Sequence, residues 1–133
     1  MSQLAAKLNL TKVGRVVVTV ADTDRAIGFY TDTLGFEKVV DVEMGPDMRW
    51  VEVALPGRET SIALAPPPAG TEPGGTQTGI CIDTSDVEAD HAALKAAGAD
   101  VDEEISRFGG PVPPMFWFRD PDGNSLLIVQ PSE

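Results

Sequence analysis

Hydrophobic and polar positions follow the same order twice along this chain. In the first half, branched aliphatic residues alternate or cluster in the way that half-buried strands require. The strands predicted from this pattern cover residues 13–20, 36–43, 49–55 and 60–65. After the first strand, the helix-start signal Asp22-Thr23-Asp24 precedes apolar residues at helical spacing, and Gly35 favours the helix end. This half therefore reads β-α-β-β-β, with a turn predicted at 44–47.

A stretch with four prolines and three glycines, residues 66–75, predicts a linker after this first half. The pattern then starts again with a strand predicted at residues 79–84. A helix is predicted next, beginning at Ser85-Asp86 and ending at Gly98, and a strand follows at residues 101–105. Residues 115–130 predict an antiparallel hairpin, since Asp120-Pro121-Asp122-Gly123-Asn124 has strong turn chemistry.

The two halves align at an offset of about 64 residues, so the helix-start signal of one falls on that of the other. We therefore predict an α+β fold in which residues 1–133 form one domain of two tandem βαβββ modules. The modules cover about residues 11–65 and 76–131. Each sheet should be mostly antiparallel with a helix on one face. The uncovered faces then either meet water or curl round a shared cavity.

Composition narrows the class of protein. A chain of 133 residues is long enough for one domain with a real core. The single cysteine, Cys81, excludes an intramolecular disulfide and favours a reducing, cytoplasmic setting. No apolar run is long enough to span a membrane, and Ser2–Leu10 predicts only a short lead-in rather than a signal peptide. The net charge of −11 argues against nucleic acid and anionic membranes as partners and favours a cationic ligand, although it could serve solubility alone.

Two motifs carry a resemblance to a known family. The run VADTDRAIGFYTDTLGF at residues 20–36 and the closing FRDPDGN at residues 118–124 resemble signatures of the vicinal oxygen chelate superfamily. This superfamily includes glyoxalase I, extradiol dioxygenases, fosfomycin-resistance enzymes, methylmalonyl-CoA epimerase and bleomycin-resistance proteins. The resemblance spans nearly the whole chain and implies cupped sheets and a homodimer. It does not select one chemistry.

The resemblance also implies where a divalent metal would be held, by histidine, glutamine or glutamate on the first and last strands of the modules. The four corresponding positions of this chain hold Arg15, Ala63, Gly79 and Leu127. None of these side chains offers a lone pair to a metal ion. We therefore expect no metal and no cofactor at the usual place. A rearranged metal site that uses Glu52 and Asp83 stays open.

Alternation along the strands predicts which side chains face the shared cavity, because residues two apart lie on the same face. The residues on the opposite faces are uniformly apolar, as helix-covered faces should be. The predicted ligand-binding cavity consists of Arg15, Thr19, Trp50, Glu52, Cys81, Asp83, Met115, Trp117, Arg119 and Leu127. Tryptophan faces stack on planar rings and attract cations, so the cavity favours a small aromatic or cationic ligand. In the alternative reading, both tryptophans pack at a module or dimer interface.

Two functions remain open at this stage. The first is metal-independent binding of a drug-like molecule or aromatic metabolite, as in the bleomycin-resistance branch. The second is a lyase, isomerase or dioxygenase that uses a rearranged metal site, or Glu52 and Asp83 as acid–base residues with a raised pKa. Glu52 and Asp83 could equally form structural ion pairs with Arg15 or Arg119. Among the other reactive residues, Cys81 is expected to be a small buried hydrophobe because no histidine is placed to activate it. His91 is expected at the surface or packed on its helix, and Tyr30 in the core.

Overall fold

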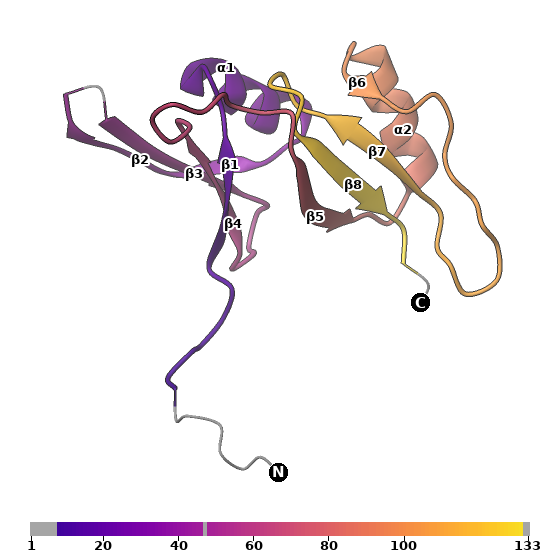
Figure 1. Ribbon diagram of the computed structural model, residues 1–133. Coiled ribbons are helices and arrows are strands. Elements are labelled where there is room, and N and C mark those ends of the chain that lie inside the picture. Colours follow the sequence, from indigo (N-terminus) through magenta and orange to yellow (C-terminus); the bar gives the residue numbers. More distant parts are fainter. Residues whose placement is uncertain (1–7, 47, 132–133) are drawn as a thin grey trace.

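The structure is a computed structural model that describes residues 8–46 and 48–131. Most of the expected lead-in Ser2–Leu10, and Asp47 of the expected turn, lie outside the described residues. The elements follow in the order β1 (Arg15–Thr19), α1 (Thr23–Gly28), η1 (Phe29–Thr33), β2 (Glu37–Gly45), β3 (Met48–Ala54), β4 (Ser61–Ala65), β5 (Gln77–Asp83), α2 (Val87–Ala96), β6 (Asp100–Val101), β7 (Met115–Arg119) and β8 (Ser125–Val129) (Figure 1). Within the described ranges, no helix is long and apolar enough to cross a membrane.

The strands form two four-stranded sheets, sheet 1 in the order β1-β4-β3-β2 and sheet 2 in the order β5-β8-β7-β6. In each sheet the first strand of the module runs parallel to the last, and the other neighbours are antiparallel. The predicted α+β fold with two βαβββ modules and mostly antiparallel sheets is therefore confirmed.

One predicted strand is mostly wrong. Only Asp100–Val101 pairs with β7 in the place of the expected strand at 101–105. The next residue, Asp102, turns its carboxylate towards the backbone of β7, where Oδ2 accepts a hydrogen bond from the Trp117 amide at 3.3 Å. A run of acidic residues favours such side-chain bonds over a regular ladder.

The helix ends follow the signals in the sequence. Asp22 caps α1 by accepting a hydrogen bond from the Arg25 amide at 3.1 Å, and Asp86 caps α2 in the same way through the Ala89 amide at 3.0 Å. Gly35 follows η1 with a φ of 84°, a backbone conformation that costs glycine little. The wider π-helical turn of η1, which continues α1, was not predicted.

The helix-facing sides of both sheets belong to one continuous core. Alternate residues of the central strands supply it, and the predicted assignment of faces is confirmed there. The core includes Val18, Val20, Val51, Val53, Ile62, Leu64, Phe116, Phe118, Leu126 and Ile128. Tyr30 is fully buried, as expected, and its ring packs edge-on against Phe36 with the centroids 5.9 Å apart. Because both covered faces share this core, the open faces of the two sheets point away from it.

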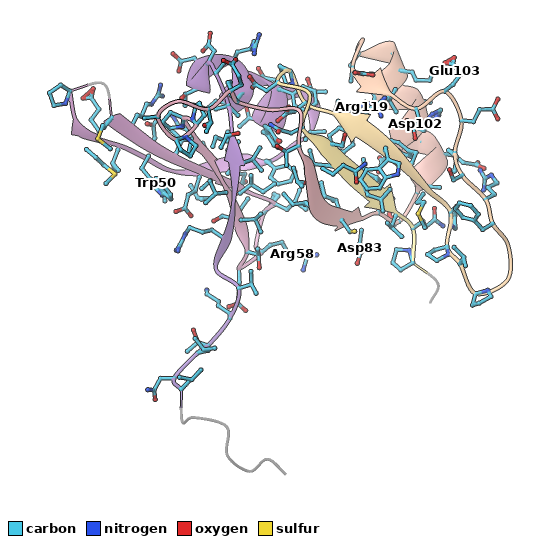
Figure 2. All side chains as sticks on the ribbon, viewed as in Figure 1. Trp50, Arg58, Asp83, Asp102, Glu103 and Arg119 are labelled. Carbon is cyan, nitrogen blue, oxygen red and sulfur yellow. The ribbon has the colours of Figure 1, made fainter. Side chains whose placement is uncertain are left out.

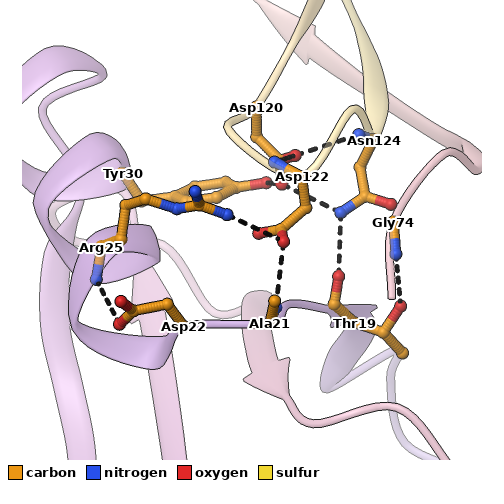
Figure 3. A network of polar contacts seen from close by, with 9 residues as sticks. All are labelled: Thr19, Ala21, Asp22, Arg25, Tyr30, Gly74, Asp120, Asp122 and Asn124. Atoms are coloured by element: carbon orange, nitrogen blue, oxygen red, sulfur yellow. Dashed lines mark hydrogen bonds and ion pairs between the residues drawn. The ribbon is translucent and has the colours of Figure 1, made fainter. Parts of the chain in front are cut away.

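The turn between β7 and β8 fastens the second module to the first (Figure 3). Asp120, which is buried, accepts a hydrogen bond from the Tyr30 hydroxyl at 2.9 Å through Oδ2. Burial and the neighbouring Asp120 carboxylate raise the pKa of Tyr30, so the phenol remains a donor. Asp122 Oδ1 accepts hydrogen bonds from the Ala21 amide at 3.0 Å and from Arg25 Nη2 at 3.1 Å.

The same turn also holds the end of β1 and the linker. Asn124 Nδ2 donates to the Thr19 carbonyl at 3.0 Å, and the Gly75 amide donates to the Asp122 carbonyl at 3.0 Å. The Gly74 amide donates to Thr19 Oγ1 at 3.2 Å. We call the contacts that residues 120, 122 and 124 make with the first module and the linker the inter-module clasp.

The two linker glycines offer a direct test of the clasp. A Cβ on Gly74 would lie 1.9 Å from the Asp122 carbonyl oxygen, whereas a Cβ on Gly75 meets nothing within 4 Å. Both residues have a positive φ, 79° and 69°. Gly75→Ala should therefore lower the free energy of unfolding by about 1–2 kcal/mol for backbone strain alone. Gly74→Ala should lower it by a further 2 kcal/mol or so, because the linker must move off the turn.

Urea denaturation followed by circular dichroism measures both losses on the full chain. Equal losses for the two variants would mean that the linker does not depend on its close approach to Asp122.

Candidate functional site

The open face of sheet 1 is organised by Glu52, which lies at the middle of β3 and is 8% exposed. Its Oε1 accepts a hydrogen bond from Ser61 Oγ at 2.6 Å, and its Oε2 accepts one from Trp50 Nε1 at 2.7 Å. Arg15 Nε lies 3.0 Å from the same Oε2. The structure thus brings together three of the predicted cavity residues, Arg15, Trp50 and Glu52, in one hydrogen-bonded cluster.

This cluster decides what Glu52 can do chemically. The hydrogen bonds from Ser61 and Trp50 and the charge of Arg15 hold the pKa of Glu52 below its usual range, although burial opposes them. A general base at neutral pH needs the opposite shift. Both carboxylate oxygens are already engaged, so Glu52 acts here to fix the indole of Trp50 against the sheet.

Apolar side chains surround the cluster on the same face. The register pairs Val17 with Ala63 and Ala63 with Glu52, and it pairs Trp50 with Val42. Val17 is 54% exposed and Val42 49%. Thr19, the last residue of β1, accepts a hydrogen bond from the Gly74 amide of the linker through its Oγ1.

The open face of sheet 2 carries the second half of the predicted set. One row across the sheet joins Cys81 of β5, Leu127 of β8 and Trp117 of β7. The next row joins Asp83 and Met115 through Val129. Trp117 and Met115 are half-buried, and Leu127 is buried.

Cys81 corrects one expectation. It is exposed, not buried. The reason is strand order: β5 is an edge strand of sheet 2, so only one neighbour covers it, and its outward face has no layer above it. The sequence pattern alone does not reveal which strands lie at an edge.

Arg119 is held by two carboxylates, Asp100 of β6 and Asp102 directly after it; Figure 2 labels Arg119 and Asp102. Nη1 contacts Asp102 Oδ1 and Nη2 contacts Asp100 Oδ1, both at 2.9 Å. These hydrogen bonds raise the pKa of Arg119 and lower the pKa of Asp100. The predicted set lacked Asp100 and Asp102, although their spacing of two residues beside a strand was a signal for one shared face.

His91 takes no part in either open face. Its Nε2 lies 2.7 Å from the Asp102 carbonyl oxygen, and its ring packs edge-on against Phe116 with the centroids 4.9 Å apart. This agrees with its expected packing role on the second helix.

Within one chain, the two halves of the predicted cavity lie on separate surfaces. Trp50 and Glu52 lie on the open face of sheet 1, and Met115, Trp117 and Leu127 on that of sheet 2. The larger pockets of residues 8–46 and 48–131 do not join these two groups. The shared cavity therefore stays a prediction.

The residues at the four family metal positions do not fit a metal ion. Arg15 is paired with Glu52, and Ala63, Gly79 and Leu127 offer no side-chain donor. Among the described residues, no group of three or more histidine, cysteine, aspartate or glutamate side chains could hold a metal. The rearranged alternative is not assembled in one chain either, since Glu52 is fully engaged on sheet 1 and Asp83 lies on β5 of sheet 2.

The Glu52 cluster predicts a pH-dependent contribution to stability. The pKa of Glu52 is lower in the folded chain than in the unfolded chain. The ionised carboxylate therefore stabilises the fold fully at a pH above the pKa of the unfolded chain. This stabilisation is lost as the pH falls through the pKa of the folded chain. Glu52→Gln should lower the free energy of unfolding by about 1–3 kcal/mol at pH 7. The difference in the free energy of unfolding between this variant and the wild type should narrow as the pH falls below about 4.

Urea titrations across this pH range measure the gap, with Glu104→Gln as a control on an exposed glutamate. A gap that stays constant with pH would show that the charge of Glu52 does not stabilise the fold.

Comparison with known proteins identifies the family of this chain. A family model described as the Glyoxalase/Bleomycin resistance protein/Dioxygenase superfamily matches residues 12–128. The uncharacterized protein YetH of Bacillus subtilis is 29% identical over 126 residues, which cover 91% of this chain and 99% of that protein.

Solved structures resemble the chain over nearly its whole length. TnmS3, an antibiotic binding protein from Streptomyces sp. CB03234, is 34% identical with a TM-score of 0.81, and the match covers 95% of this chain and 100% of that one. A superfamily member from Sphaerobacter thermophilus is also 34% identical, with a TM-score of 0.83, and the match covers 91% and 98%. The sequence motifs, the paired βαβββ modules and the family match agree: this chain belongs to the Glyoxalase/Bleomycin resistance protein/Dioxygenase superfamily.

Proposed function

We propose that this chain is a metal-independent binding protein for a drug-like or aromatic small molecule. The observation that carries the proposal is the composition of the two open faces. Each presents one half-buried tryptophan, Trp50 or Trp117, among aliphatic side chains. Tryptophan faces stack on planar rings, and an apolar surface with few polar groups suits small-molecule binding.

Charge on the open faces favours a neutral or cationic ligand. Glu52 neutralises Arg15 on sheet 1, and two carboxylates hold Arg119 on sheet 2. Asp83 adds a further negative charge at the edge of sheet 2, and the chain as a whole carries −11. An anionic ligand would meet no uncompensated cation from these two arginines, whereas a planar cation gains from the indole faces.

The ligand site would be built by a homodimer. The open faces point away from the common core, so a face with Trp50 can meet a face with Trp117 only if a second chain supplies it. A twofold dimer of this kind makes two equivalent sites. The similarity to TnmS3, which is an antibiotic binding protein, supports this kind of ligand.

Loss of either tryptophan should weaken ligand binding. Proflavine, a planar cation, serves as the probe, and anthraquinone sulfonate, a planar anion, serves as its counterpart. We expect proflavine to bind more tightly than the anion, and Trp50→Ala and Trp117→Ala each to raise the Kd for proflavine at least about tenfold. Isothermal titration calorimetry on the full chain measures these constants without relying on tryptophan fluorescence.

Phe108→Ala is the matched control, because Phe108 is an exposed aromatic residue on the loop between β6 and β7 and outside both sheets. If the control weakened binding as much as the tryptophan variants, or if the wild type bound neither probe, the open faces would not be the ligand site.

Metal removal should leave binding unchanged. The Kd for the probe should be the same after EDTA treatment and dialysis as after addition of Ni²⁺, Zn²⁺, Mn²⁺ or Fe²⁺, because the four family positions supply no side-chain ligand. Elemental analysis of the purified chain checks the same point. A stoichiometric metal, or binding that depends on one, would refute metal independence.

A further inference from the structure

The side-chain oxygen of Asn124 is a buried hydrogen-bond acceptor without a partner. Asn124 is 1% exposed, and its Nδ2 donates to the Thr19 carbonyl and to Asp120 Oδ2, each at 3.0 Å. These two bonds fix the orientation of the amide group, because the reverse orientation would place its oxygen against two acceptors. Among the described residues, nothing donates to Asn124 Oδ1. A buried acceptor that stays unpaired is costly, so this oxygen needs a donor or a cation.

A small pocket beside Asn124 offers room for such a partner. It measures about 160 Å³ and is lined by the edge strands β1 and β5 next to the inter-module clasp. The lining residues are Val17, Val18, Thr19, Thr76, Gln77, Thr78 and Asn124. In Figure 3 the amide oxygen of Asn124 points away from Asp120, to the side on which Gly74 lies. We call this space the Asn124 pocket, and it is large enough for an ion with a few water molecules.

The polar atoms around the Asn124 pocket are mostly neutral oxygens. Three threonine hydroxyls and two side-chain amides line it, and none of the described residues in the lining is charged. Thr76 Oγ1 and Thr78 Oγ1 donate their hydrogens to the Gly74 and Ser125 carbonyls, at 3.3 Å and 2.8 Å. Their oxygen lone pairs therefore remain for a bound species. A lining that offers mainly acceptors disfavours an anion.

Charge in the adjoining clasp favours a cation. Asp120 is 4% exposed, and the side chain of Asp122 is 3% exposed. All donors to Asp120 are neutral, since they are the Tyr30 hydroxyl, the Asn124 amide group and two backbone amides. In the described part of the chain, Arg25 is the basic residue that pairs with these carboxylates, and it contacts Asp122 alone. Two buried negative charges thus face one positive charge, and a cation at Asn124 Oδ1 would lie only one amide group away from Asp120.

We propose that the Asn124 pocket binds a monovalent alkali cation of the size of K⁺. Asn124 Oδ1 is its buried ligand, the hydroxyl oxygens of Thr76 and Thr78 are the other candidates, and water completes the shell. Neutral oxygens can replace the hydration shell of K⁺, whereas Mg²⁺ and Ca²⁺ draw on carboxylate ligands. The ion joins β1, the start of β5 and the turn between β7 and β8, so it stabilises the clasp.

Thermal unfolding of the full chain tests this site. At an ionic strength of about 0.15 M, potassium chloride should give a Tm about 3–5 °C higher than N-methylglucamine hydrochloride does. The reason is that K⁺ binds the folded chain, whereas the bulky organic cation cannot approach a buried oxygen. Equal ionic strength removes the effect of general screening. Equal Tm values in the two salts would overturn the proposal.

Two variants separate the ion effect from a general loss of stability. Asn124→Ser removes the unpaired oxygen and should abolish the difference in Tm between the two salts. Arg25→Gln is the matched control, because it also breaks a contact of the clasp but changes no residue that lines the pocket. It removes the positive charge beside the carboxylates, so the potassium effect should persist or increase. A potassium effect that survives in Asn124→Ser, or that disappears in Arg25→Gln, contradicts the assigned site.

A crystal soaked in rubidium chloride provides a direct measurement on the unmodified chain. Rubidium has the chemistry of potassium and a usable anomalous signal, so we expect an anomalous peak within coordination distance of Asn124 Oδ1. Water alone in the pocket, or rubidium only at exposed carboxylates as an adventitious ion, would refute the site even if Asn124→Ser did not fold.

These tests are independent of the proposed ligand binding. The Asn124 pocket contains neither Trp50 nor Trp117 and lies outside the four family metal positions. A chain that binds proflavine but shows no potassium effect and no rubidium peak would refute the cation site alone.

Discussion

Two carboxylates in the turn between β7 and β8 hold the modules of this protein together. Asp120 accepts a hydrogen bond from the hydroxyl of the buried Tyr30, and Asp122 accepts hydrogen bonds from the Ala21 amide and from Arg25 Nη2. These three bonds join residues 90 to 101 positions apart in the sequence, and they fix α1 and the end of β1 against sheet 2. Buried hydrogen bonds to a charged group are stronger than neutral ones and costly to leave unmade. The clasp therefore determines how the two sheets meet.

The position of the open faces follows from this arrangement. Once the clasp brings the helix-facing sides of both sheets into one core, the sides with Trp50 and Trp117 must point away from it. The same geometry leaves a partly uncovered apolar pocket between the two modules, lined by residues such as Val16 and Ile80. The two modules thus share one core, whereas the surfaces proposed for binding lie outside it.

The sequence predicted the faces well and the connections between them poorly. Side chains alternate along a strand with a period of two, so Val51 and Val53 on one side and Trp50 and Glu52 on the other could be assigned from the pattern alone. Exposure of Cys81 depends on strand order, which the pattern does not contain. The clasp was missed for a similar reason: the turn motif predicted a hairpin, but the partners of Asp122 lie about a hundred residues away.

The polar residues of the predicted site are better explained by positioning than by catalysis. A catalytic carboxylate at neutral pH needs a raised pKa, and the pKa of Glu52 is lowered by the groups that hydrogen-bond to it. Arg119 is likewise held by Asp100 and Asp102. When the charges on a face neutralise one another, the remaining free surface is aromatic and aliphatic. Such a surface recognises shape and planarity, and this supports the proposed binding function.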